Sequence, residues 1–283
     1  MTICKGMATC KMGMNYEELL RCPKCHQAGK MIFHPDPGDI RLARCEGCNY
    51  KLPVYGGIPD FAEHIALTDP KLNPAQKLMN SWLFAFLYES FLWRPLHTRI
   101  GSGISTEQEV REVLEMSRVA PEDRVVDLAC GTGHYARAFA RRVPEGLVYG
   151  LDVSLSMLGR GHKIARRKGL TNIIFLRGDI HLLPFDDKSI DRVNCGGALH
   201  LFGDLRPIWK EVSRILKPKG VFTAMTLTLT DGAIRKGQQW LVDRGRATFF
   251  HPDQLASDLS AVGLSSFKYH KHRISLLFCA VKD

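Results

Sequence analysis

Short apolar runs alternate with amphipathic stretches from Gly101 to the end of the chain, and this alternation constrains the fold more than any other feature. Strands separated by helices pair mostly in parallel, and helices then cover both faces of the sheet. Two final apolar runs without a helix between them predict a terminal hairpin that adds an antiparallel strand. We expect strands at 124–130, 147–153, 173–179, 190–196 and 220–228 and two within 266–282, with helices at 105–119, 133–143, 155–169, 205–217 and 252–262.

Two Cys-x-x-Cys pairs lie near the N-terminus, with nineteen residues between them. This spacing lets four thiolates surround one zinc ion tetrahedrally. An all-cysteine set leaves no open position for water, so we expect a structural zinc and not a catalytic one. The ligands would be Cys22, Cys25, Cys45 and Cys48, in a small, turn-rich zinc ribbon over residues 15–62.

The segment 63–104 begins with the Pro-bearing linker "LTDPKLNPAQ" and continues as an aromatic helical stretch, which we expect to form a cap. Most of its aromatic side chains should pack on a neighbouring domain, and some could line an acceptor pocket. A second candidate lid lies at 229–251, between the fifth strand and the last helix. Candidate pocket residues are Trp82, Tyr88, Trp93, Arg94, Trp240 and Phe250.

The composition is that of an ordinary soluble protein of 283 residues, with a formal net charge of +10. The first residues lack the apolar core of a secretory signal, so we expect a cytoplasmic protein in a reducing compartment. The most apolar stretch, "WLFAFLYESFLW", contains Glu89 and is too short to cross a bilayer. The positive charge favours acidic partners without choosing among them, and the basic run 160–169 fits either a solvated helix face or a nucleic-acid contact.

A glycine-rich loop, Gly131-Thr132-Gly133, joins the first strand of the alternating region to a helix. Glycines there let the backbone turn sharply and approach a ligand, and the helix N-terminus offers free N–H groups. Dinucleotide enzymes begin similarly, with Ala136 at their third glycine position. Asp127, four residues before the loop, places negative charge where a pyrophosphate would lie. A cationic amino-acid moiety suits that position better.

Two further carboxylates follow the next two strands. Asp152 ends the second strand, where an acidic side chain can accept hydrogen bonds from both ribose hydroxyls. Asp179 follows Gly178 at the end of the third strand, where it can accept from an adenine amino group. The carboxyl ends of parallel strands meet at one edge of a sheet, so the sequence predicts a nucleoside-type ligand there.

Four segments together resemble the class I S-adenosylmethionine-dependent methyltransferases: "VVDLACGTG", "GLDVSLSML", "LRGDIHLLPFDDKSIDRV" and "EVSRILKPKG". The resemblance covers about 109–283 and is nearest to the ubiquinone and menaquinone C-methyltransferases. It implies a Rossmann-like seven-stranded sheet that ends in an antiparallel hairpin. This sheet would belong to a methyltransferase domain over 105–283, which follows the zinc ribbon in the sequence.

The same resemblance assigns roles by position. It implies that Asp127, Gly131 and Gly133 hold the methionine part of S-adenosylmethionine, that Asp152 holds the ribose, and that Asp179 with Ile180 holds the adenine. Cys130 would be a small wall of the site and not a nucleophile. Further candidate cofactor contacts are Ala129, Val153, Met157 and Cys195, the last of which also fits a buried core position.

Methyl transfer from a sulfonium requires mainly alignment of the acceptor, exclusion of water and, for some acceptors, removal of a proton. The candidate general base is His200, which follows the fourth strand. It could instead pack on the cofactor or cap the next helix.

The N-terminal run, including the "PVYGGIP" ending, resembles the small zinc-ribbon proteins that bind and activate RNA and protein methyltransferases. The leading hypothesis is methyl transfer to a small, hydrophobic or aromatic acceptor. An RNA methyltransferase acting on rRNA or tRNA is the first alternative, less favoured because the ribbon itself is nearly neutral. A non-catalytic cofactor-binding scaffold that docks partners through its ribbon is the second. The sequence does not predict the oligomeric state.

Overall fold

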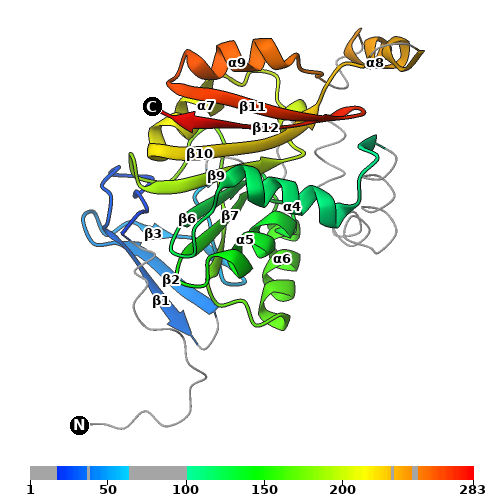
Figure 1. The fold of residues 1–283 in the computed structure, drawn as a ribbon. Helices are drawn as coiled ribbons and strands as arrows, with labels where there is room; N and C mark the ends of the chain where they lie inside the picture. Colours follow the sequence, from blue (N-terminus) through cyan, green and yellow to red (C-terminus); the bar gives the residue numbers. More distant parts are fainter. Residues whose placement is uncertain (1–17, 37–38, 64–100, 231–232, 244–247) are drawn as a thin grey trace, which may run out of the picture.

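The computed structural model describes residues 18–36, 39–63, 101–230, 233–243 and 248–283. Its centre is a seven-stranded sheet of order β11-β12-β10-β9-β6-β7-β8, in which β6 to β10 run parallel and β12 pairs antiparallel with both β10 and β11 (Figure 1). The strands are β6 (Arg124–Leu128), β7 (Leu147–Asp152), β8 (Ile173–Arg177), β9 (Ile190–Gly196), β10 (Leu216–Leu227), β11 (Leu264–His272) and β12 (Ser275–Lys282). The predicted Rossmann-like sheet with its terminal hairpin is confirmed.

Two of the helices begin at polar capping residues that the sequence provides. Ser105 Oγ accepts from Gln108 N at 3.1 Å to start α4, and Ser154 Oγ accepts from Met157 N at 3.4 Å to start α6. The helices are α4 (Thr106–Ser117), α5 (His134–Arg142), α6 (Leu155–Arg167), the 3-10 turn η1 (Leu199–Leu201), α7 (Arg206–Ile215), α8 (Ala233–Asp243) and α9 (Pro252–Ser260). Of the described helices, none is both long and apolar enough to cross a membrane.

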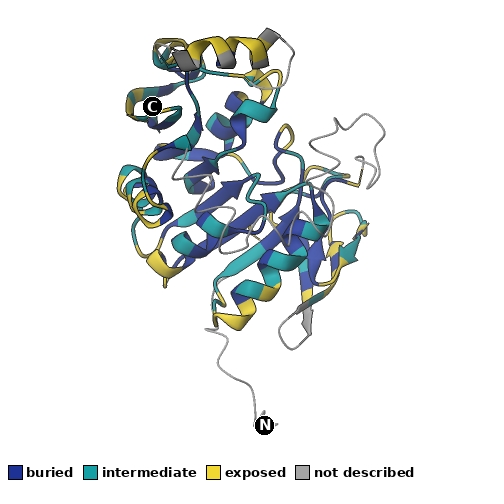
Figure 2. Ribbon diagram, turned by 90° about the vertical axis from the view of Figure 1, so that its right-hand side faces the viewer, coloured by how far each residue is buried: buried dark blue, intermediate teal, exposed yellow. Residues whose placement is uncertain are grey.

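Successive residues of the strands point to opposite faces, and each face has its own cover. Val125 and Val148 face a cluster with α4 and α5, whereas Val126 and Tyr149 face the cluster that contains α7 and α9. In Figure 2 the central strands are largely dark blue and the outer helix surfaces teal or yellow, so the centre of the sheet is the buried layer. Helices therefore cover both faces, as predicted.

The N-terminal ribbon (residues 18–63) packs on the second of these faces, at the β7–β8 end of the sheet. Between β8 and β9 the chain forms no helix, so this part of the face lacks the helical cover found elsewhere. The ribbon's Leu20 and Phe61 belong to the same buried cluster as Tyr149, Leu176 and Phe185. The ribbon thus completes the core of the sheet. Its strands are β1 (Met31–Asp36), β2 (Asp39–Cys45), β3 (Lys51–Leu52), β4 (Val54–Tyr55) and β5 (Ile58–Pro59).

Backbone pairing fixes the ribbon at two places. Arg21 N donates to Pro184 O at 3.0 Å and Asp186 N donates to Leu19 O at 2.8 Å. At the other end of the ribbon, Phe61 N donates to Arg177 O at 2.8 Å, beside edge strand β8. The ribbon tail therefore extends the sheet by a short parallel bridge at its otherwise unpaired edge, which protects that edge from other chains.

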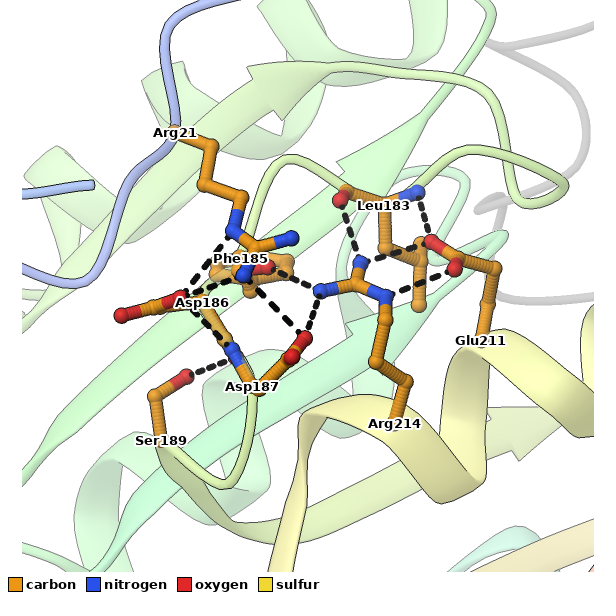
Figure 3. A network of polar contacts seen from close by, with 8 residues as sticks. All are labelled: Arg21, Leu183, Phe185, Asp186, Asp187, Ser189, Glu211 and Arg214. Carbon is orange, nitrogen blue, oxygen red and sulfur yellow. Dashed lines mark hydrogen bonds and ion pairs between the residues drawn. The ribbon is translucent and has the colours of Figure 1, made fainter. Parts of the chain in front are cut away.

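A polar network surrounds the first of these contacts (Figure 3). The Arg21 guanidinium lies 2.7 Å from Asp186 Oδ1 and 3.2 Å from Asp187 Oδ1. Arg214 on α7 bonds Asp187, Glu211 and the carbonyls of Leu183 and Phe185. The loop between β8 and β9 is therefore held by the ribbon on one side and by α7 on the other, although it contains no helix.

Two predicted features differ from the structure in detail. The fifth strand starts at Leu216 and not at 220, because "LKPKG" continues the strand through an irregularity in its pairing, with Lys219 at φ 66°. The expected lid at 229–251 contains helix α8, which the sequence pattern did not predict. The linker and the aromatic stretch, with Trp82, Tyr88, Trp93 and Arg94, lie almost entirely outside the described residues.

Candidate functional site

The two Cys-x-x-Cys turns have the same backbone geometry. His26 N donates to Cys22 O at 2.9 Å, and Asn49 N donates to Cys45 O at 2.8 Å. His26 and Asn49 occupy the left-handed region, with φ 58° and 57°. Each turn therefore presents its two thiols from equivalent positions.

The four thiols converge. The sulfur atoms of Cys22 and Cys48 are 3.7 Å apart, those of Cys25 and Cys45 are 3.6 Å apart, and all four sulfurs lie within 4.8 Å of one another. A zinc ion bonded to four sulfurs at about 2.3 Å requires edges of about 3.8 Å. The separations are far longer than the roughly 2.05 Å of a disulfide. The donor set and its dimensions thus fit a tetrahedral zinc ion.

The glycine loop between β6 and α5 is held in left-handed backbone conformations. Ala129 has φ 49°, Gly131 φ 55° and Gly133 φ 76°. A Cβ on Gly131 would meet nothing within 4 Å, whereas a Cβ on Gly133 would lie 2.6 Å from the Phe175 ring. Gly133 is therefore needed for packing, while Gly131 borders open space in which a ligand can approach the backbone.

Asp152, the last residue of β7, contacts this loop directly. Its Oδ2 accepts from Gly131 N at 2.8 Å, and its Oδ1 accepts from Ser154 N at 2.9 Å. Burial raises the pKa of Asp152, although these backbone hydrogen bonds act in the opposite direction. Each carboxylate oxygen has a second lone pair, so the group can still accept from a ligand hydroxyl.

Asp127 on β6 is 1% exposed and lies behind the loop. Its Oδ2 accepts from Ala136 N in the first turn of α5 at 2.9 Å, and its Oδ1 accepts from Asn194 Nδ2 at 2.7 Å. Asn194 stands opposite Asp127 in the parallel β6–β9 register. Asn194 was not predicted from the sequence, where its only signal was an amide within an apolar strand.

Asp179 and Ile180 form the turn after β8. Asp179 Oδ1 accepts from His181 N at 2.9 Å and lies 2.8 Å from His181 Nδ1, and the Asp179 side chain is 20% exposed. Ile180 is buried in the core cluster. Gly178 N donates to Asp152 O at 3.0 Å, which joins this turn to the end of β7. The structure therefore brings the second and third predicted carboxylates to neighbouring strand ends.

The remaining predicted contacts have varied surroundings. Val153 accepts from Arg177 Nε through its carbonyl oxygen at 3.0 Å, and Met157 is buried in the first turn of α6. Cys195 is fully buried on β9, and burial raises its pKa, so its surroundings match a core position. Burial, with the Asp152 and Asp127 carboxylates, also raises the pKa of the Cys130 thiol.

His200 lies in η1, directly after β9 and the pair Gly196-Gly197. Its side chain is partly buried, and its carbonyl accepts from Thr248 N at 3.4 Å. Of the candidate pocket residues that the structure describes, Trp240 on α8 is 46% exposed, and Phe250 is partly buried against the core. Phe250 pairs with the end of β10.

Arg177 and Asp60, which meet across the ribbon contact beside the candidate site, were not predicted from the sequence. Arg177, which immediately precedes the Gly178-Asp179 turn, donates from Nη1 to Asp60 Oδ2 at 2.7 Å and to Ala62 O at 3.0 Å. An arginine at the end of an apolar strand was the available signal. Through Arg177 the ribbon tail is connected to the last residue of β8 and to the backbone of Val153, just after β7.

Residues 120–246 match a family model described as a methyltransferase domain. This part of the chain is a methyltransferase domain. This agrees with the seven-stranded sheet and its glycine loop, and it disfavours the hypothesis of a non-catalytic scaffold.

The relatives of this methyltransferase are similar to it over different lengths of the chain. An uncharacterized chloroplastic methyltransferase of Arabidopsis thaliana is 26% identical over 97% of this chain and 81% of its own length. The demethylmenaquinone methyltransferase of Geobacillus kaustophilus is 36% identical over 44% of this chain and 55% of its own length. Similarity to the Arabidopsis protein thus includes the N-terminal ribbon.

One similar solved structure is a complex between the Haloferax volcanii Trm112 methyltransferase activator and a putative methyltransferase. The matched chain has a TM-score of 0.56 and 21% identity, over 72% of this chain and 96% of that one. At this identity the likeness shows the fold of the methyltransferase domain.

Proposed function

We propose that this methyltransferase transfers a methyl group from S-adenosylmethionine to a small, hydrophobic or aromatic acceptor. The observation that carries the proposal is the grouping of Gly131, Asp152 and Asp179 at the carboxyl ends of three adjacent strands. The demethylmenaquinone methyltransferases, which are 35–36% identical over about 130 residues, support an apolar acceptor of quinone type.

The residues around the loop fit S-adenosylmethionine. In our proposal the backbone of Ala129, Gly131 and Gly133 borders the methionine part, and Asp152 accepts from the ribose hydroxyls. Asp179, Ile180, Val153 and Met157 surround the adenine. Asp127 holds the loop through Ala136 N and Asn194, and its charge favours the cationic ligand. Cys195 supports the site from the core.

S-adenosylmethionine, when bound, supplies an electrophilic methyl group on a sulfonium. The protein then has to align the acceptor, exclude water and remove a proton where the acceptor requires it. His200 is our candidate for that last role, because it follows β9 beside the glycine pair at the carboxyl edge. Its unperturbed pKa of about 6.5 suits proton removal near neutral pH. Trp82, Tyr88, Trp93, Arg94, Trp240 and Phe250 remain candidate acceptor contacts.

We further propose that the chain is organised as a zinc ribbon (15–62), a linker and aromatic cap (63–104) and the methyltransferase domain (105–283). Zinc at Cys22, Cys25, Cys45 and Cys48 would have a purely structural role, since four thiolates complete a tetrahedral shell. The ribbon would then maintain the β7–β8 end of the sheet, which forms the cofactor site.

The test is transfer of labelled methyl from S-adenosylmethionine to a panel of acceptors: reduced demethylmenaquinone, other small aromatic compounds, and total RNA. We expect label in the organic extract with wild type, and at least about 100-fold slower labelling with His200→Ala, because general-base catalysis contributes about 100- to 10,000-fold. Trp240→Ala tests the acceptor contact separately. Label found only in RNA would overturn the proposal.

RNA methylation is the second candidate, because the chain carries a +10 charge and α6 ends in exposed basic residues. These are Lys163, Arg166, Arg167 and Lys168. If RNA is the acceptor, RNA binding should weaken steeply with salt, and charge reversal at Arg166 and Arg167 should reduce that slope. Absence of binding at moderate salt would remove this candidate.

A further inference from the structure

A second cluster of metal-ligand side chains lies away from the cysteines. His270 and His272 are two residues apart on β11, so both side chains point to the same face of the sheet. Glu112 reaches them from α4, 158 and 160 residues earlier in the chain. One donor atom from each side chain lies within 4.8 Å of the other two, a grouping that was not predicted from the sequence.

The distances in the cluster are close to those of a metal site. Glu112 Oε2 is 2.7 Å from His272 Nε2 and 3.5 Å from His270 Nδ1. Two ligands at about 2.0–2.1 Å from one tetrahedral zinc ion lie about 3.3–3.4 Å apart. The longer distance already matches this value. The shorter one is a hydrogen-bond length and has to open by about 0.6 Å, which a rotation of the Glu112 carboxylate can provide.

The carboxylate is also oriented by a neighbour. Gln108, one turn earlier on α4, donates from Nε2 to Glu112 Oε1 at 3.0 Å, which leaves Oε2 directed at the imidazoles. Metal-binding carboxylates are commonly held in this way by a second hydrogen bond. The Glu112 and His272 side chains are 15% and 23% exposed, and that of His270 is 57% exposed. An ion can therefore enter from solvent on the His270 side.

We propose that Glu112, His270 and His272 bind a divalent transition metal ion of the zinc class, with solvent as the fourth ligand. Imidazole and carboxylate donors suit zinc, nickel and copper, and two histidines with one glutamate form a familiar zinc set. The ion would join edge strand β11 to helix α4 and so fix the terminal hairpin. The hairpin turn itself is bonded to the end of β10, since Thr228 N donates to Ile274 O at 2.8 Å.

The experiment compares zinc binding by the tag-free full chain and two double variants. His270→Ala/His272→Ala removes two ligands, and the matched control His34→Ala/His251→Ala removes two other exposed histidines. After equilibrium dialysis at micromolar free zinc, we expect wild type and control to retain one equivalent more zinc than His270→Ala/His272→Ala. Once the cysteine site is loaded in all three proteins, further zinc should raise the melting temperature of wild type and the control only.

Two single variants keep the test valid if the double variant folds poorly. Glu112→Gln retains the side-chain shape and should weaken zinc binding at this site, and Gln108→Ala should weaken it about 10-fold by releasing the carboxylate. Cobalt binding gives an independent readout, because the cysteine site has thiolate charge-transfer bands and the histidine site has none. Equal zinc content and affinity in wild type, Glu112→Gln and His270→Ala/His272→Ala would show a simple ion pair and overturn the proposal.

Discussion

Arg177 and Asp60 form a buried ion pair between β8 and the ribbon tail, with 2.7 Å between Nη1 and Oδ2 and side chains only 2% and 3% exposed. Arg177 also donates to the carbonyl oxygens of Ala62 and Val153. One guanidinium therefore connects the ribbon, the end of β7 and the strand that leads to Asp179.

Replacing Asp60 should destabilise the whole chain. Asp60→Ala leaves the Arg177 charge buried without its carboxylate, and breaking such a pair costs about 3–5 kcal/mol. Urea unfolding at neutral pH measures this. The control is Asp186→Ala, which removes a partner of Arg21 whose side chain is 38% exposed, and it should cost about 1 kcal/mol or less. Equal losses in both variants would show that the buried pair has no special role.

The two loop glycines should respond differently to alanine. Gly133→Ala forces a Cβ to within 2.6 Å of the Phe175 ring, in addition to the roughly 1–2 kcal/mol of left-handed strain. Gly131→Ala carries the strain alone, because no atom lies within 4 Å of the new Cβ. We expect the larger loss of unfolding free energy for Gly133→Ala. Both variants should bind S-adenosylmethionine more weakly by calorimetry, and normal binding by Gly131→Ala would contradict the proposed cofactor site.

Asp152→Asn should separate cofactor binding from stability. Loss of a charged acceptor costs about 1.5–3 kcal/mol, so the Kd for S-adenosylmethionine should rise about 10- to 100-fold. Burial raises the folded-state pKa of Asp152, so the ionised group opposes folding increasingly as pH rises through that pKa. Asparagine removes this charge, but its NH2 group then faces one of the two N–H donors, Gly131 or Ser154, so the opposing effects should leave only a small change in the neutral-pH melting temperature. A lower melting temperature with unchanged Kd would contradict this assignment.

Zinc loss from the cysteine site should affect the sheet as well as the ribbon. Cys25→Ser should lower the zinc content by one equivalent after dialysis against a weak chelator. Because Leu20 and Phe61 share a core with Tyr149 and Phe185, the whole chain should then unfold at lower urea in a single transition. Cys279→Ser, at a buried thiol outside the cluster, should keep its zinc. A ribbon that unfolds separately while the sheet keeps its stability would refute the shared core.

The Glu112 cluster should give a pH-dependent stability in the presence of chelator. Burial raises the pKa of Glu112, but hydrogen bonds from His272 and Gln108 outweigh it and the net shift is downward. A lowered carboxyl pKa contributes stability above the unfolded value of about 4.3, which is lost as pH falls through the folded pKa. The difference in unfolding free energy between wild type and Glu112→Gln should be present above about pH 4.3 and should shrink as the pH falls further, through the lowered folded-state pKa of Glu112. A difference independent of pH would exclude the ion pair.

Local pattern was enough to predict the sheet, the terminal hairpin and the convergence of the cysteines. Apolar periodicity and capping residues are properties of neighbouring positions, so they can be interpreted before any contact is known. The same holds for Gly131, Asp152 and Asp179, because parallel topology alone brings the ends of β6, β7 and β8 to one edge. Helix α8 was not predicted, and Gly237 near its middle is a residue of low helix propensity.

Only the tertiary structure decided how distant parts of the chain meet. The ribbon covers the sheet where no helix follows β8, Asp60 pairs with Arg177, Asp127 pairs with Asn194, and Glu112 meets two histidines of β11. Each of these contacts joins residues more than sixty positions apart. Their physical basis is the burial of apolar surface and the pairing of buried polar groups, both of which depend on which faces pack together. The sequence by itself determined the elements and the chemistry they carry, and packing determined which of those groups act as one site.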